Sequence, residues 1–397
     1  MRQTFLPYCK PFVDNDEMAA VIEALSNGWL TTGPKVKAFE QAFAEEAGVR
    51  HAIALNSCTA GLHLALVALG VGPGDEVITP SLTFVAGAQC IRELGARPVF
   101  CDIDETTLCL SVRTIDAVVT ERTKAIIAMP YAGRPTGIAA IVAYAHARGI
   151  AVIEDAAHGV GMLDDGAWPG AVADIAVYSF YATKNVTSGE GGMLVTADDA
   201  LADRIRILSL HGMDRDAWKR YTRGASWKYD VVEPGYKYNM PDLLAAVGLE
   251  NFKKLNRMQA RRRELAARYI DGLSAFPGVR VPGIPLGRRD RHAWCMFALL
   301  IDEAEAGASR DELIDALREA QIGTSVHYIP THHFSAYRDL PRGPLPVTEK
   351  AARQLVSLPL YPSMTDRDAE DVLEAIGDAL SAGRYVRMDA APRRQHA

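Results

Sequence analysis

The chain has 397 residues, of which 49% are hydrophobic and 23% charged, as is ordinary for a globular protein. Its net charge of −6 and pI near 6.0 argue against a nucleic-acid partner without excluding a local anion site. No run of 18 apolar residues and no apolar N-terminal segment occurs, so we expect no membrane span and no signal peptide.

The six cysteines are expected to be reduced thiols. They show no CxxC pair and do not form an even framework in a short chain; they lie at positions 9, 58, 90, 101, 109 and 295. This usage favours a cytoplasmic protein, and we expect no metal site.

Short β-type runs alternate with helical runs from residue 51 onward. The expected strands lie in HAIALNS, DEVITP, PVFCDID, KAIIAMPYAG, IAVIEDAAH and DIAVYSFYATKN, and helices are expected in TAGLHLALVALG, SLTFVAGAQCIRELG and IAAIVAYAHARG. Such alternation predicts a parallel sheet with right-handed crossovers, and the nearly continuous apolar runs predict strands covered on both faces. The fold class is therefore α/β, with a three-layer α/β/α domain over roughly residues 15–240.

The pattern changes after residue 240. Residues 241–273 have apolar positions at helical spacing and predict one long helix that leaves the first domain. HAWCMFALLID and TSVHYIP predict strands, and SRDELIDALREA predicts a helix with a Ser-x-x-Glu capping box. We expect a large domain over 1–250, a smaller α+β domain over 251–385, and a flexible tail over 386–397.

Ligands of a parallel sheet bind at the carboxyl ends of its strands, so the residues after each strand are the candidates for chemistry. The first strand leads into NSCTAGLH, where free backbone N–H groups at the start of a helix could hold a phosphate. A plain helix cap by Ser57 or Thr59 is the alternative interpretation. Phe84 follows the second strand, and core packing is its ordinary explanation.

Two later strand ends carry charged groups. Asp155 ends an apolar run, where it could either cap the next helix or meet a buried cation. His158 could bond to Asp155, lie near a ligand ring, or be structural. Lys184 follows a strand near Ser179; it could form an ordinary salt bridge, or act as a nucleophile that forms a Schiff base. Pyridoxal phosphate would use all of these groups together, because it needs a lysine, a carboxylate, a ring platform and a phosphate cup.

Several segments resemble one enzyme family in order and spacing: GWLTTGPKVKAFE, NSCTAGLH, GDEVITPSLTFVA, IEDAAH, SFYATKN, GEGGMLVT and GYKYNM. Over about residues 5–380 the chain resembles the DegT/DnrJ/EryC1/StrS aminotransferases, which are fold type I pyridoxal-phosphate enzymes that aminate keto-sugars attached to nucleotides. Within that family, ITPSLTFV, TTGPK, His158 and GYKYN are most similar to the UDP-4-amino-4-deoxy-L-arabinose aminotransferases. Phe84, where close relatives often have tryptophan, and Tyr181-Ala182-Thr183 depart from those enzymes, so the sugar could differ.

The resemblance implies a role for each matching residue. Lys184 would be the Schiff-base lysine and proton shuttle, Asp155 the partner of the pyridine nitrogen, and Phe84 and His158 the platforms of the ring. The implied phosphate ligands are Ser179, Thr59 and Ala60, with Asn239 reaching in from the neighbouring subunit of a homodimer. The implied substrate residues are Thr31, His327 and Tyr328.

The implied activity is amino transfer from glutamate to a keto-sugar nucleotide, expected to be a UDP-4-keto sugar, for lipopolysaccharide or another glycoconjugate. A lyase or dehydratase on the same fold and a non-catalytic regulatory protein of the family are the alternatives. Family dehydratases have histidine in place of the lysine, so Lys184 favours transamination. The segment between His211 and Gly235 is aromatic and basic, and either closes over a pyrophosphate or is a solvated loop.

Overall fold

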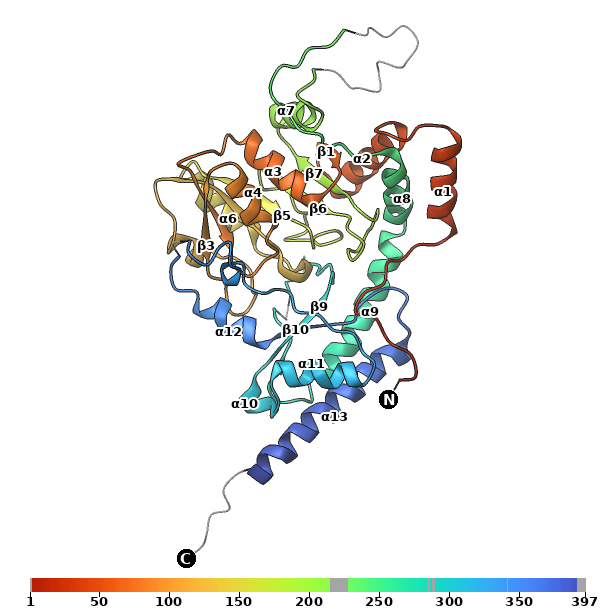
Figure 1. Ribbon diagram of the computed structural model, residues 1–397, viewed down its shortest axis with the longest axis vertical. Coiled ribbons are helices and arrows are strands. Elements are labelled where there is room, and N and C mark those ends of the chain that lie inside the picture. The colour runs from red at the N-terminus through yellow and green to blue at the C-terminus, as the bar shows by residue number, and fades with distance from the viewer. Residues whose placement is uncertain (1, 215–227, 284–285, 288–289, 341, 391–397) are drawn as a thin grey trace, which may run out of the picture.

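The computed structural model describes the whole chain except residues 1, 215–227, 284–285, 288–289, 341 and 391–397. A large sheet wrapped by helices forms the upper part of the molecule, and a smaller layer built from the C-terminal segments lies below it (Figure 1). Most of the segment that could close over a pyrophosphate lies outside the described residues.

The large sheet has seven strands in the order β1-β7-β6-β5-β4-β2-β3. Their bounds are β1 (His51–Leu55), β2 (Glu76–Pro80), β3 (Arg97–Cys101), β4 (Thr123–Ala128), β5 (Ala151–Asp155), β6 (Ile175–Ser179) and β7 (Gly192–Thr196). All neighbouring pairs are parallel except those of β7, which is antiparallel to both β1 and β6. The expectation of a wholly parallel sheet is therefore wrong at one strand. Only residues 180–191 join β6 to β7, without a crossover helix, and parallel pairing needs such a crossover.

Helices cover both faces of this sheet, so the three-layer α/β/α architecture is confirmed. In β6, Ile175 and Val177 join the buried cluster on one face, whereas Ala176 and Tyr178 join the cluster on the other. The first face is covered by α3 (Cys58–Ala68), α4 (Ala86–Glu93) and α7 (Asp199–Ser209). The second is covered by α2 (Pro34–Ala47), α5 (Val112–Asp116), α6 (Ile138–His146) and α8 (Asp242–Lys253).

The N-terminus of α2 is capped from a distant part of the chain. Its N-cap residue is Gly33, which has no side chain to accept a hydrogen bond, and Pro34 at the first position has no N–H. The buried Asp242 carboxylate instead accepts from the backbone N–H groups of Gly33 (2.7 Å), Lys35 (3.0 Å) and Val36 (3.0 Å). A single carboxylate therefore joins the start of α8 to the start of α2.

Residues 241–273 form two helices and not the single helix expected. The break between α8 and α9 (Leu255–Leu273) lies at Lys254, whose backbone leaves helical geometry at φ −93° and ψ 1°. The Lys254 ammonium is held by the acidic start of α1 (Asn15–Ser26), with Nζ 2.7 Å from Glu17 and 3.2 Å from Asp16. The kink reflects a tertiary contact that helical periodicity does not encode.

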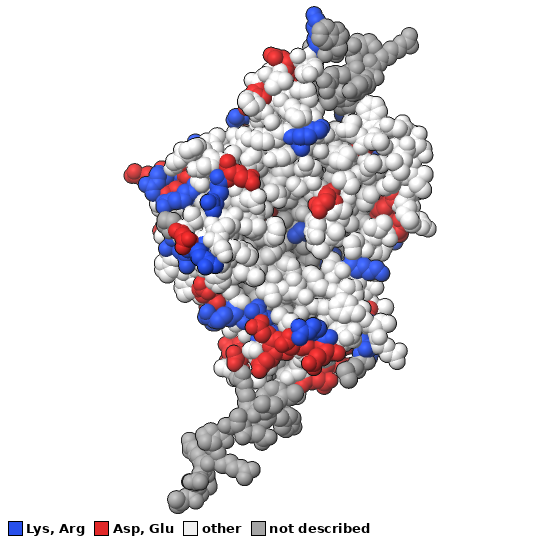
Figure 2. Space-filling model, in the orientation of Figure 1, with Lys and Arg blue, Asp and Glu red and all other residues white. Residues whose placement is uncertain are grey.

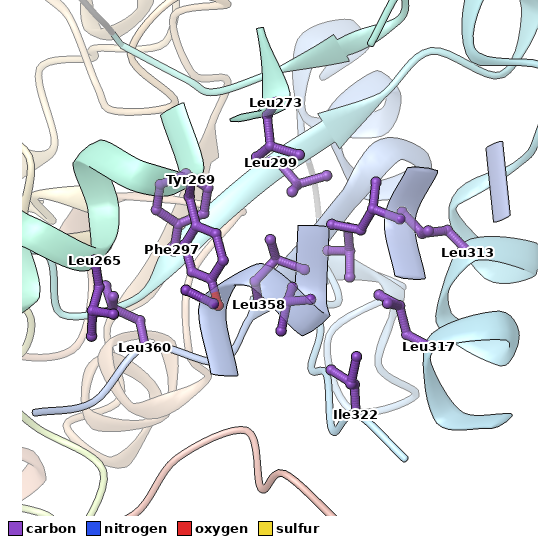
Figure 3. Packing of buried hydrophobic residues seen from close by; sticks show 14 of the residues in the cluster. Leu265, Tyr269, Leu273, Phe297, Leu299, Leu313, Leu317, Ile322, Leu358 and Leu360 are labelled. Carbon is purple, nitrogen blue, oxygen red and sulfur yellow. The ribbon is translucent and has the colours of Figure 1, made fainter. Parts of the chain in front are cut away.

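A second buried cluster lies below the large sheet, around a three-stranded antiparallel sheet of order β10-β9-β8 (Figure 3). Its strands are β8 (Val279–Arg280), β9 (Phe297–Ile301) and β10 (Leu355–Leu358), and the surrounding helices are α9, α10 (Glu303–Ala306), α11 (Arg310–Glu319), α12 (Pro346–Gln354) and α13 (Asp366–Ala390). The smaller α+β layer is thus confirmed. Leu6 also packs in this cluster, so the N-terminal segment adds to the C-terminal layer.

Three local expectations for this layer have different outcomes. The Ser309–Glu312 capping box at the start of α11 is present. The strand expected in TSVHYIP is wrong: only the bridge from Ser325 to Ser357 forms there, followed by the 3-10 turn η3 (Thr331–His333). The chain expected to be a tail from residue 386 continues α13 up to Ala390.

Charged side chains are unevenly spread over the surface (Figure 2). Asp and Glu gather at the lower end of the face shown, whereas its middle is mostly uncharged. Among the described residues, no helix is both long and apolar enough to span a bilayer.

Candidate active site

A cavity of about 460 Å³ opens at the carboxyl end of the large sheet. It is lined by residues that directly follow β1, β2, β5 and β6, so the strand-end argument leads to a single site. Of the residues predicted from sequence, the cavity wall contains Thr59, Phe84, Asp155, His158, Ser179, Lys184, His327 and Tyr328.

Lys184 lies in the connection from β6 to β7, which a β-turn-like contact holds in place. Its backbone N–H donates to the Tyr181 carbonyl at 2.9 Å. The neighbouring Thr183 carbonyl accepts from the Cys9 thiol at 3.6 Å, which ties the connection to the N-terminal segment. Burial, and then the Lys184 charge, lowers the pKa of both His158 and His327, so the amine acts on two groups across the cavity.

Asp155 is the last residue of β5 and is 6% exposed. Burial raises the pKa of its carboxyl group, while the Ala157 N–H bond (3.2 Å) and the Lys184 charge oppose that shift. The carboxylate is therefore costly to ionise unless a cation lies against it. This is the property required of a partner for a protonated ring nitrogen.

The buried His158 and the half-buried Tyr328 form a pair in the wall. The Tyr328 hydroxyl is 2.9 Å from His158 Nε2, and the two rings are nearly parallel, with an interplanar angle of 4° at 6.1 Å. Burial, and then the charge of Lys184, lowers the pKa of His158 well below its usual range. His158 is accordingly a neutral imidazole at physiological pH, and its Nδ1 atom has no hydrogen-bond partner in the described structure.

Replacing Tyr328 with phenylalanine should destabilise the protein by about 1–3 kcal/mol, because it leaves a second ring nitrogen of a buried histidine without a partner. Urea unfolding of the cofactor-free protein measures the change. Tyr144→Phe is the matched control, since the Tyr144 hydroxyl bonds to Asp116 at 2.6 Å on the surface, where water replaces the lost partner. An equal loss of unfolding free energy in the two variants would contradict the view that Tyr328 satisfies a nitrogen of the buried His158.

The start of α3 is the part of the wall suited to holding an anion. Ser57 caps this helix by accepting from the Ala60 N–H at 3.0 Å, so the Ala60 donor expected to bind phosphate is already used in this structure. Thr59 lines the cavity, and the positive end of the helix dipole lies beside it. Ser179 faces the same space, with its hydroxyl accepting from Tyr181 N–H at 3.3 Å.

Phe84, the expected platform for the ring, lines the cavity but is 59% exposed, with its ring 6.3 Å from that of Tyr328. His327 is fixed by a 2.9 Å contact between its Nδ1 and the Ser357 hydroxyl. Burial, and then the Lys184 charge, lowers the pKa of His327 to about 4, so it also is neutral.

Thr31 and Asn239, like Ala60, are absent from the lining of the cavity of their own chain. The Thr31 carbonyl accepts from the Asp242 N–H at 3.1 Å. The Asn239 side chain donates to Thr32 Oγ1 at 2.6 Å and accepts from the Lys237 ammonium at 2.6 Å. Their predicted contacts with substrate and with a neighbouring subunit stay predictions.

The cavity also contains residues that sequence reasoning missed. Tyr8 comes from the N-terminal segment, with its ring 5.3 Å from that of His327, and no local pattern marks it. The Cys58 thiol is 3.8 Å from Asp155 Oδ1. In the segment NSCTAGLH, the sequence analysis had given roles to residues beside Cys58 but none to Cys58 itself. Glu190, in the glycine-rich GEGG, also lines the wall.

Comparison with known proteins agrees with this geometry. Residues 11–377 match the DegT/DnrJ/EryC1/StrS aminotransferase family. The chain belongs to this family.

Relatives that match nearly full length include the spore coat polysaccharide biosynthesis protein SpsC of Bacillus subtilis (strain 168). It is 48% identical over 381 residues, which cover 95% of this chain and 97% of SpsC. Among solved structures, DesI with its TDP-sugar product has a TM-score of 0.87 and 33% identity, covering 98% of this chain and 96% of DesI. The PLP form of the putative sugar aminotransferase Spr1654 from Streptococcus pneumoniae has a TM-score of 0.87 and 28% identity, covering 96% and 99%.

The cofactor of this aminotransferase is pyridoxal phosphate, as the sequence predicted. The donor set fits it: one cavity holds an amine, a buried carboxylate and the N-terminus of a helix. The fold type I assignment is confirmed by the same relatives. The closeness to the UDP-4-amino-4-deoxy-L-arabinose enzymes stays a prediction.

Proposed function

We propose that this protein is a sugar-nucleotide aminotransferase that moves an amino group from glutamate to a UDP-4-keto sugar, for lipopolysaccharide or another glycoconjugate. The observation that carries the proposal is the shared cavity of Lys184 and Asp155 in a chain of this family. SpsC is named for polysaccharide biosynthesis and DesI was solved with a TDP-sugar, which supports a nucleotide-linked sugar substrate.

The roles of the residues follow from charge and position. Bound pyridoxal phosphate supplies an electron sink for carbanion character at the substrate carbon. Lys184 would take the proton from the carbon of the amino donor and, in the second half-reaction, supply a proton to the sugar carbon that receives the amino group, because its amine lines the cavity. Asp155 keeps the ring nitrogen protonated. His158, being neutral, adds no competing charge beside that ring.

The substrate side of the cavity is formed by His327 and Tyr328, from the C-terminal layer, together with the exposed Phe84. We assign these residues, and Thr31, to the binding of the sugar nucleotide. Neutral His327 is suited to donate or accept a hydrogen bond with a sugar hydroxyl.

The working unit is proposed to be a cytoplasmic homodimer whose subunits share active sites through Asn239. Helix α1 supports this assembly because it exposes Met18, Ile22 and Leu25, an apolar face that a second subunit would cover. The six cysteines are free thiols, which is consistent with a reducing compartment.

The holoenzyme should convert glutamate to 2-oxoglutarate in a single turnover, and should then aminate one member of a panel of 3-keto and 4-keto UDP-, dTDP- and GDP-sugars. Mass spectrometry of 2-oxoglutarate and of the amino-sugar product measures both steps. Failure with glutamate and every other amino donor would favour a lyase or dehydratase, and failure to take up the cofactor would favour a regulatory protein. Amination of a dTDP- or GDP-sugar in preference to UDP-sugars would change the proposed nucleotide and leave the rest of the proposal in place.

A further inference from the structure

Two adjacent histidines and one carboxylate meet away from the cavity, where η3 contacts α12. His332 Nε2 is 2.9 Å from Glu349 Oε1, and His333 Nε2 is 3.1 Å and 3.2 Å from the two oxygens of the same carboxylate. One atom from each of the three residues can be chosen so that all lie within 4.8 Å of one another. The amino-transfer site described above uses none of these groups.

The geometry suits a metal ion better than a surface ion pair. A tetrahedral ion with ligand bonds of about 2.0–2.1 Å holds its donor atoms about 3.3 Å apart, close to the separations between each histidine and the Glu349 carboxylate. Imidazole nitrogens with one carboxylate form a donor set typical of divalent transition metals. His333 and Glu349 side chains are about 40% exposed, so an ion can enter from solvent and keep a water ligand.

Buried contacts position two of the three donors in advance. His332 is 2% exposed, and its Nδ1 lies 2.6 Å from the Ser81 hydroxyl. When Nδ1–H donates to that hydroxyl, the Nε2 lone pair is left for an ion, which is the arrangement that metal-binding histidines use. Glu349 is held by α12, whose start is anchored by Asp102 through the N–H groups of Val347 (3.0 Å) and Thr348 (2.8 Å).

We propose that His332, His333 and Glu349 form a binding site for one divalent transition-metal ion, for which Zn²⁺ is the probe. The sequence led us to expect no metal site, because nothing in the spacing of residues shows that the fold brings His332 and His333 to Glu349.

The ion would join α12 to the segment that carries Phe84. Ser81 directly follows β2, its carbonyl accepts from Thr331 N–H at 2.8 Å, and the Thr83 carbonyl accepts from Thr331 Oγ1 at 3.3 Å. Binding would therefore stabilise the native fold in proportion to zinc concentration, since the unfolded chain does not hold the three donors together.

The test is zinc binding by the untagged holoenzyme, measured by isothermal titration with ZnCl₂ and by metal content after gel filtration. The wild type should take up one equivalent, and its melting temperature should rise with added zinc. His333→Ala and Glu349→Gln should each weaken binding at least tenfold and remove the zinc-dependent rise. His146→Ala is the matched control, because His146 is an exposed histidine that faces a single carboxylate, Asp174, at 3.0 Å.

His333→Ala and Glu349→Gln change partly exposed side chains and leave the buried contact between His332 and Ser81 in place, so both variants should fold. Zinc uptake by either variant at the wild-type level would overturn the proposal, because the ion would then be held at the cofactor site or at a cysteine. Less than one tenth of an equivalent on the wild-type holoenzyme would overturn it as well. The result is independent of which sugar or amino donor the enzyme uses.

Discussion

Replacing Lys184 with alanine should lower the rate of amino transfer by about 10⁴-fold or more, because one side chain supplies both the nucleophile and the proton shuttle. Single-turnover formation of 2-oxoglutarate from glutamate measures the loss. The cavity and the buried Asp155 remain in this variant, so it should still bind the cofactor non-covalently.

Two matched variants separate chemistry from charge. Lys184→Arg keeps the positive charge near Asp155 but should be as inactive as the alanine variant, because guanidinium stays protonated and cannot shuttle the proton. Lys124→Ala changes an exposed lysine of β4 and should be fully active. Borohydride treatment of the wild-type holoenzyme should attach the cofactor to the peptide that contains Lys184. Attachment to another peptide would contradict the role given to Lys184.

Replacing Asp155 with asparagine should reduce turnover by about 10²- to 10³-fold, the loss typical of removing one preorganised electrostatic partner. The amide keeps the shape of the side chain but cannot hold a proton on the ring nitrogen. Steady-state kinetics with glutamate as donor measures this effect, and a loss of less than tenfold would contradict the role given to Asp155.

The same substitution should stabilise the cofactor-free protein. Burial raises the folded-state pKa of Asp155 above its usual value of 3.8, so the folded state holds the proton more tightly than the unfolded state does. The contribution of this carboxyl group to the free energy of unfolding is therefore largest below pH 3.8 and falls as the pH rises towards the raised pKa. The free energy of unfolding of Asp155→Asn, measured with urea, should therefore increase relative to that of the wild type as the pH is raised from 4 to 7. A constant difference over that range would contradict the buried position of the carboxyl group.

Together, these two expected effects would mark Asp155 as a group retained for chemistry at a cost in stability. Lys184 reduces that cost, since its charge opposes the shift caused by burial. Bound cofactor should remove more of it, because a ring nitrogen would place a cation directly against the carboxylate.

Local sequence pattern was sufficient to predict the strands that precede the site and to locate Asp155 and Lys184 at their ends. Asp155 and Lys184 both follow apolar runs that became β5 and β6, and carboxyl ends of parallel strands necessarily meet at one edge. Roles for Phe84, His158 and Ser179 came from the family resemblance, and the structure places all three in the same cavity wall.

Pattern was insufficient for the direction of β7, which follows from a connection from β6 that is too short for a crossover helix. It was also insufficient where distant segments meet, as at the break between α8 and α9, where Lys254 contacts the acids of α1. Tyr8 reaches the cavity from near the N-terminus, although no periodicity marks it as more than a surface residue.

The sequence by itself determined the α/β class and put Lys184 and Asp155 at strand ends, because apolar periodicity is a local property. Pyridoxal phosphate was expected from the set of residues at those ends and from the family resemblance. Only the tertiary structure decided that His158 bonds to Tyr328, that Asp242 caps α2, and that two histidines meet Glu349. Each of those contacts joins residues far apart in the chain, so packing in three dimensions, and not the spacing of residue types, brings their polar atoms within bonding distance.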